Sequence, residues 1–255
     1  MEFVQFLGQD NVVRFVLLFG RMSGLVAFFP FFSHMKIPVV IKTALVFFFT
    51  IFLFPYAGDI AFEPSTLTLV FAFVSELMMG FVGGLLLFIL FAALQLAGEQ
   101  ISFVMGFTMA SVIDPQTGTN MPLIGQILTT LALVLFLTFD GHHLLILLYY
   151  HSLKAVPLGT FYPDSSLWTY ISTGVINLFL FGFILSFPIK ALSLLADVIF
   201  GMLMKTMPQF NLLVVGFPIK IMMAFVVLIA VLGAMMSVFK REILQILNNL
   251  PYILF

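Results

Sequence analysis

The longest apolar stretch of the chain occupies residues 67–97 and reads LTLVFAFVSELMMGFVGGLLLFILFAALQLA, with Glu76 as its one charged residue. About 20 apolar residues cross the hydrocarbon core of a typical bilayer, so this stretch is long enough to span a membrane as a helix. Because it is longer than an upright span requires, we expect it to tilt, to protrude, or to pack on protein outside the lipid. Strands of a membrane barrel would instead alternate in polarity over about ten residues, and this continuous stretch excludes them.

Five further apolar stretches of comparable length occupy most of the remaining chain, at residues 12–32, 39–57, 123–148, 171–196 and 212–239. The sequence therefore predicts an all-α, polytopic membrane protein with about six long, partly kinked helices. Little chain is left between these stretches for a separate soluble domain, so we expect one helical domain over residues 1–255. The first stretch lacks a basic start and a small-residue cleavage site, which excludes a signal peptide.

The composition excludes several classes of protein. Of the 255 residues, 62% are hydrophobic and 8% are charged, whereas a soluble domain has about 45–50% and about 25%. A net charge of -1 provides no basic stripe for nucleic acid, so we expect no DNA or RNA partner. The absence of cysteine excludes a disulfide framework, a thiolate metal site and a cysteine nucleophile.

Charged residues inside the predicted spans are costly if they face lipid, so they are expected to face protein or water. We predict inter-helix polar contacts for Arg14, Arg21, Lys42, Glu76, Glu99, Asp140, His142, His143, Lys190 and Lys220. Basic residues outnumber acidic ones inside the spans, so pairing within one chain is not expected to neutralise all of them. Partner helices are expected to supply the missing acidic groups.

Small residues and prolines indicate how the helices pack. Gly20 with Gly24, and Gly80 with Gly84, form GxxxG motifs that allow two helix backbones to approach closely. The segment Phe-Pro-Ile-Lys occurs at 187–190 and again at 217–220, within the last two predicted spans. Each proline removes a helical hydrogen bond, so we predict kinks at Pro188 and Pro218.

The one hydrophilic cluster inside a span is Asp140-Gly141-His142-His143, followed by His151. Its acidic and imidazole groups are compatible with a proton relay or with a metal-dependent hydrolase site. Adjacent histidines on a helix point about 100° apart and no HExxH motif is present, so we expect no metal. The favoured interpretation is that these side chains satisfy backbone or neighbouring-helix groups at a break near Gly141. Motifs of intramembrane proteases, P-loops and dinucleotide-binding folds are absent, so we expect neither an enzyme nor a cofactor.

The longest connection covers residues 98–122 and is too apolar for a solvated loop. Its phenylalanine, methionine, valine and isoleucine side chains stand between glycines, a composition that favours a compact but deformable hydrophobic plug. We therefore interpret the connection as the constriction of a pore, with a re-entrant connector buried only for packing as the alternative.

A set of residues in fixed order resembles the FliR family, membrane proteins of the flagellar export gate whose counterparts in virulence type III secretion are called SctT. The residues that carry the resemblance are Phe29-Pro30, Pro38, Ala97-Gly98-Glu99, Gly106, Asp114-Pro115, Asp140-Gly141-His142-His143, Ser152, Pro157, Pro208-Gln209-Phe210-Asn211 and Gly216-Phe217-Pro218-Ile219-Lys220. Three positions depart from the family pattern: Lys42 and Lys205 replace an expected arginine, and Phe210 replaces Met or Leu. A lysine acts as a point charge, so any bidentate arginine pairing at these positions would be lost.

The resemblance implies a gate subunit that forms a pore with FliP and FliQ, is contacted by FlhB, and is held largely above the plane of the inner membrane at the flagellar basal body. It implies FliP-like helices followed by a kinked, FliQ-like hairpin around residues 171–239. It also marks the loop after the third span as a plug that closes the pore until unfolded export substrates pass. The implied plug residues are Gly106, Phe107, Met109, Val112, Ile113, Asp114, Pro115, Asn120, Met121 and Pro122.

A second class of function remains open from the residues alone. A free-standing secondary transporter or ion channel would use Asp140, His142 and His143 as its proton relay. Flux through the purified chain alone would distinguish this reading from a gate subunit, which needs its partners.

Overall fold

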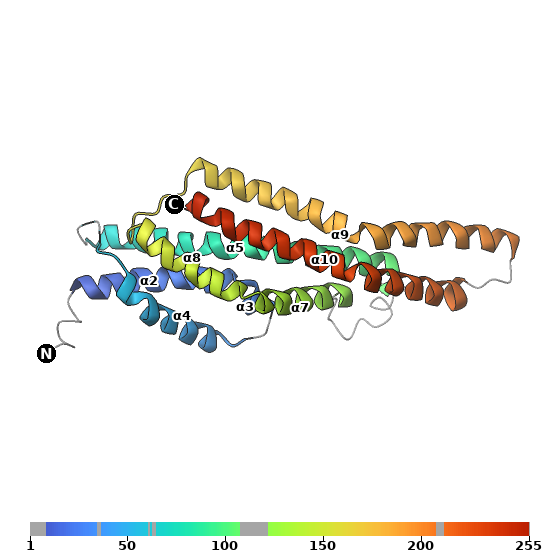
Figure 1. The fold of residues 1–255 in the computed structure, drawn as a ribbon, viewed down its shortest axis with the longest axis horizontal. Helices are drawn as coiled ribbons and strands as arrows, with labels where there is room; N and C mark the ends of the chain where they lie inside the picture. The colour runs from blue at the N-terminus through green and yellow to red at the C-terminus, as the bar shows by residue number, and fades with distance from the viewer. Residues whose placement is uncertain are drawn as a thin grey trace. The chain divides into compact units, whose positions relative to one another are not determined.

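The computed structural model describes residues 9–34, 37–60, 62, 65–107, 122–207 and 212–254. Within these residues the chain is helical and has no strand, which confirms the predicted all-α class (Figure 1). The elements are α2 (Gln9–Phe28), α3 (Pro30–His34), α4 (Val39–Leu53), η1 (Phe54–Tyr56), α5 (Thr66–Met105), α7 (Leu123–Thr138), α8 (Gly141–Ala155), α9 (Ser165–Thr206), η3 (Leu212–Gly216) and α10 (Phe217–Leu254).

Five of the described helices are long and apolar enough to cross a membrane, and the number is six if the bent pair α7 and α8 counts as one span. This agrees with the six predicted stretches and identifies a polytopic membrane protein. Helices α5, α9 and α10 have 40, 42 and 38 residues. At about 1.5 Å per residue each is about 60 Å long, twice the hydrocarbon thickness of a bilayer.

The fourth predicted stretch, 123–148, is not one helix. Helix α7 ends at Thr138 and α8 begins at Gly141, with a bend of 64° between them. Asp140 forms the break and has a left-handed backbone with φ of 58°. Aspartate tolerates this region better than most residues because its short polar side chain bonds locally. The helix break that the sequence suggested near Gly141 therefore lies directly before it.

The expected loop at 98–122 begins later than predicted, because α5 continues to Met105. Ile101 and Met105 lie one turn apart on α5 and are both fully buried, so packing extends the helix through this segment. Gly98 allows the approach of α7, since a methyl group there would overlap with the Cα of Gly125. The prediction of irregular structure over 98–105 was therefore wrong.

The chain groups into two compact units. Unit 1 comprises Met1–Ile89, Leu137–Gly174 and Ile243–Phe255, and unit 2 comprises Leu90–Phe136 and Val175–Glu242. Helices α5, α9 and α10 contribute residues to both units. The single-domain organisation and the FliQ-like hairpin at 171–239 stay predictions.

In unit 1 the two GxxxG motifs face each other across α2 and α5. A methyl group at Gly24 would lie 2.7 Å from the backbone nitrogen of Phe81, and one at Gly80 would overlap with the carbonyl oxygen of Arg21. Helix α2 also packs on α4, where the rings of Phe15 and Phe47 meet edge to face at 5.6 Å. Close backbone contact between α2 and α5 is what brings their polar side chains together.

Unit 2 is built on aromatic packing between α5, α7 and α10. The ring of Phe91 contacts Phe239 at 5.1 Å and Phe136 at 6.3 Å between centroids. Pro188 lies inside α9, whereas Pro218 is the second residue of α10, which follows directly after the π-helical turn η3. The kinks predicted at these prolines stay predictions.

Candidate functional site

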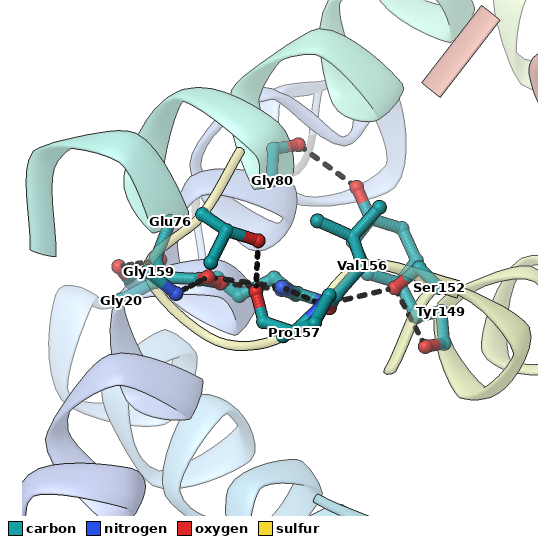
Figure 2. Close-up of polar contacts among 11 residues, drawn as sticks. Gly20, Glu76, Gly80, Tyr149, Ser152, Val156, Pro157 and Gly159 are labelled. Atoms are coloured by element: carbon teal, nitrogen blue, oxygen red, sulfur yellow. Dashed lines mark hydrogen bonds and ion pairs between the residues drawn. The ribbon is translucent and has the colours of Figure 1, made fainter. Parts of the chain in front are cut away.

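A cluster of buried polar groups joins three helices of unit 1. Arg21 of α2 and Glu76 of α5 form an ion pair in which both side chains are 0% exposed. The Nη2 of Arg21 donates to Oε1 of Glu76 at 2.9 Å, and its Nε donates to Oε2. Its Nη1 donates to the hydroxyl of Ser152 on α8 at 3.1 Å, and its Nη2 also reaches the carbonyl oxygen of Val156 at 3.4 Å. We call Arg21, its three partners and Gly159 the Arg21 cluster; Figure 2 shows Glu76, Ser152, Val156 and Gly159 around its centre.

The Arg21 cluster also holds the connection between α8 and α9. The backbone N–H of Gly159 donates to Oε1 of Glu76 at 2.6 Å, as Figure 2 shows. Gly159 has φ of 81°, a region that glycine adopts without strain. One turn before Ser152 on α8, the hydroxyl of Tyr149 donates to the carbonyl oxygen of Gly80 at 2.9 Å. Because each buried charge has partners, the arrangement fixes helices rather than supplying a reactive group.

The connection ends at Asp164, outside the helices, and its carboxylate caps α9. It accepts a hydrogen bond from the backbone N–H of Ser165 at 2.6 Å. This bond, with those from the Ser165 and Ser166 hydroxyls, holds the pKa of Asp164 below its usual value.

The remaining predicted polar residues of unit 1 lie nearer the surface. Arg14 donates to the carbonyl oxygen of Gly58 at 3.2 Å and pairs with Asp59, whose side chain is 97% exposed. Lys42 lies half-buried on α4.

In unit 2 Lys190 and Lys220 find partners within the chain. Lys220 of α10 donates to both carboxylate oxygens of Asp197 on α9, at 2.7 and 2.8 Å. Lys190 of α9 donates to the side-chain oxygen of Gln100 on α5. Glu99 is exposed and accepts a hydrogen bond at 3.3 Å from Gln95 of its own helix. Sequence reasoning missed Asp197 because it stands one residue beyond the predicted apolar stretch 171–196.

The structure gathers Asp140, His142 and His143 at the start of α8. One ligand atom from each lies within 4.8 Å of the others, whereas His151 does not belong to the group. Nδ1 of His143 lies 3.1 Å from Oδ1 of Asp140, and both side chains are about two-thirds exposed or more, at 67% and 71%.

The two adjacent histidines do not point apart as expected. Their ring centroids are 4.1 Å apart. Nδ1 of His142 is buried and has no hydrogen-bond partner among the described residues. The three side chains offer an open set of donors at a helix start; the expectation that no metal binds there stays a prediction.

The proposed plug begins at the end of α5. Gly106 has φ of 87°, and a methyl group there would lie 3.2 Å from the ring of Phe217. The ring of Phe107 meets that of Phe225 edge to face at 6.0 Å. Pro122 directly precedes α7, and its carbonyl oxygen accepts a bond from the N–H of Gln126 at 3.1 Å. The other plug residues lie outside the described residues: Met109, Val112, Ile113, Asp114, Pro115, Asn120 and Met121.

Comparison with known proteins gives a consistent family assignment. The sequence model of the bacterial export proteins, family 1, matches residues 12–246. The chain is 34% identical over 238 residues to the flagellar biosynthetic protein FliR of Bacillus subtilis (strain 168), covering 91% of each chain. It is 30% identical over 249 residues to the FliR protein of Escherichia coli (strain K12), covering 96% of this chain and 93% of that protein. It is 26% identical over 228 residues to the FliR protein of Aquifex aeolicus (strain VF5), covering 87% and 86%.

Proposed function

The chain belongs to the bacterial export proteins, family 1, and from this premise we propose that it is a pore-forming subunit of the flagellar export gate. As a flagellar export protein of the FliR family it is a membrane component of an export apparatus and not an enzyme. In the proposal it forms the pore with FliP and FliQ and is contacted by FlhB. The assembly stands in the bacterial inner membrane at the flagellar basal body and passes unfolded export substrates.

The observation that supports this proposal best is the mismatch between helix length and bilayer thickness. Helices α5, α9 and α10 are about 60 Å long, so much of each must lie outside a hydrocarbon core of about 30 Å. On α9, exposed apolar side chains continue from Trp168, which is 59% exposed, to Met204, which is 41% exposed, over about 54 Å of helix. Apolar surface that neither lipid nor the chain itself covers requires partner helices.

The plug belongs to the same proposal. Gly106 and Phe107 directly follow α5 and lie against phenylalanine rings of α10, so the plug segment begins from packed residues. In the proposal residues 106–122 close the pore, and Phe107, Met109, Val112, Ile113 and Met121 seal it against water and ions. The glycines of the segment allow it to yield when a substrate passes.

The test is ion leakage through assembled complexes in cells. Replacing residues 106–122 by a short Gly/Ser linker is expected to raise leakage, and so is replacing Met109, Val112 and Ile113 together by serine. The matched control changes Gln116 and Thr117 of the same segment to serine, which keeps the sealing side chains and is expected to leave leakage unchanged. Unchanged leakage in complexes that assemble with the linker would exclude the plug.

The alternative proton relay makes a different prediction. A free-standing transporter would carry substrate as the purified chain alone and would lose flux on Asp140→Asn or His142→Gln. The gate subunit is expected to show no flux without its partners. Flux through the isolated chain that depends on Asp140 would replace the gate proposal.

A further inference from the structure

In unit 2, one face of α9 is tied to the last turns of α5 by polar contacts. The hydroxyl of Ser186 and the ammonium of Lys190 both donate to the side-chain oxygen of Gln100. The hydroxyl of Ser193 donates to the carbonyl oxygen of Val104 at 2.8 Å. Ser186, Lys190 and Ser193 are spaced by four and three residues, so they share one face of α9.

These contacts also define the register of the two helices. Nearer the start of unit 2, a methyl group at Gly182 would lie 3.0 Å from the carbonyl oxygen of Ala93. The first contact joins Gly182 of α9 to Ala93 of α5, and the last joins Ser193 to Val104. The contacts follow the same order along both helices, so the two helices run parallel. A displacement of α9 along α5 by one helical turn, about 5.4 Å, would break the contacts that Ser186 and Ser193 make.

Helix α10 is tied to α9 by charge. Lys220 is 8% exposed and donates to both oxygens of Asp197, whose side chain is 54% exposed. Removing Asp197 would leave the buried ammonium of Lys220 without its counter-charge. Apolar ridges alone allow neighbouring registers at similar energy, whereas a buried cation with one carboxylate partner favours a single register.

Helix α10 also contacts the residues at the end of α5, so each of the three helices has contacts with the other two. Phe217 and Phe225 lie in the first turns of α10, on either side of Lys220 in sequence. The Phe217 ring lies against Gly106, and the Phe225 ring meets that of Phe107. Each of α5, α9 and α10 is therefore held by the other two.

We infer that Asp197 and Lys220 are positioning residues, which hold the start of α10 in the register that seats Phe217 and Phe225 on Gly106 and Phe107. Helix α9 is itself held on α5, because Ser186 and Lys190 contact Gln100 and Ser193 contacts Val104. Asp197 of α9 therefore has a fixed position from which it holds Lys220. The inference rests on the proposed function in one respect: if residues 106–122 form a plug, this pair sets the position of its base.

The first experiment measures directly how close positions 107 and 225 lie, and its readout does not depend on any gate function. The chain contains no cysteine, so Phe107→Cys with Phe225→Cys provides the only two thiols of this chain for a short thiol-specific crosslinker in the complex purified with its partners. Adding Lys220→Met or Asp197→Asn is expected to lower the initial crosslinking rate about fivefold, as the seated population falls. Asp197→Glu keeps the charge and is expected to restore the rate. The matched control, Arg241→Met, removes an exposed cation of α10 whose contact with Glu242 is 3.5 Å, and is expected to have no effect.

The second experiment separates this inference from the proposed function. Ion leakage is compared in assembled complexes that carry Lys220→Met, Asp197→Asn or the Gly/Ser replacement of residues 106–122. These chains do not carry the two introduced cysteines. Leakage in all three of these variants, together with no leakage in Arg241→Met, supports the positioning role. Leakage only in the replacement, or crosslinking unchanged in both single variants, overturns it. If the Gly/Ser replacement causes no leakage, the plug is excluded, and so is the role of Asp197 and Lys220 in positioning it.

Discussion

Replacing Glu76 by leucine tests whether the Arg21 cluster holds unit 1 together. The substitution removes a fully buried carboxylate and leaves the guanidinium of Arg21, which is 0% exposed, without its counter-charge. Arg21 keeps the hydroxyl of Ser152 and the carbonyl oxygen of Val156, which are neutral acceptors at 3.1 and 3.4 Å. The backbone N–H of Gly159 loses its acceptor as well. Breaking a buried pair on one side costs about 3–5 kcal/mol.

The assay is thermal unfolding of the purified chain in a mild detergent. For a chain of this size each kcal/mol shifts the midpoint by about 2–4 °C, so Glu76→Leu is expected to lower it by about 6–20 °C. The matched control is Asp59→Leu, which breaks the pair with Arg14 at a side chain that is 97% exposed. Exposed pairs contribute little, so the control is expected to leave the midpoint unchanged.

A double variant checks that the penalty comes from the unpaired charge. Combining Arg21→Met with Glu76→Leu removes both charges and keeps similar volume, so it is expected to recover more than half of the midpoint lost in Glu76→Leu. The reasoning would be refuted if Glu76→Leu behaved like Asp59→Leu. It would also be refuted if the double variant unfolded no later than the single one.

Three further predictions use the same unfolding assay. Gly80→Ala is expected to destabilise by about 1–3 kcal/mol because the methyl group overlaps with the carbonyl oxygen of Arg21, and a neutral result would mean that α2 and α5 do not touch there. Gly201→Ala, on α9 with no atom of the described residues within 4 Å of the added carbon, is expected to stabilise by about 0.5–1 kcal/mol; a loss of stability would contradict this open surrounding. Tyr149→Phe removes the bond to the carbonyl oxygen of Gly80 and is expected to cost about 0.5–1.5 kcal/mol, so a stabilised variant would contradict that bond.

The number and place of the long helices could be predicted because continuous apolar stretches determine them. Their ends could not, since they depend on tertiary packing. Helix α5 extends to Met105 because Ile101 and Met105 are buried in unit 2, and no local signal in the sequence marks that burial. The stretch 123–148 is continuous in hydropathy, and only the polar residues at Asp140-Gly141 indicated the break that Asp140 makes with its left-handed backbone.

The polar residues were identifiable individually, whereas their partners were not. Buried charges in apolar spans indicate Arg21, Glu76 and Lys220, because such residues must be paired. The expectation that partner helices supply the missing acids overlooked Asp59 and Asp197, which neutralise Arg14 and Lys220 within the chain. Asp59 stands in a connection and Asp197 just beyond a span, and hydropathy alone does not show that chain folding brings them to the basic side chains.

The central claim is tested most directly by the native mass of the chain expressed together with FliP-like and FliQ-like partners and purified in mild detergent. The account predicts one large complex of discrete stoichiometry, because the exposed apolar side chains along α9 need partner helices to cover them. The chain expressed alone is expected to have a smaller native mass, because detergent then covers the exposed apolar side chains. A well-behaved monomer or homo-oligomer whose mass does not change when the partners are present would contradict the account.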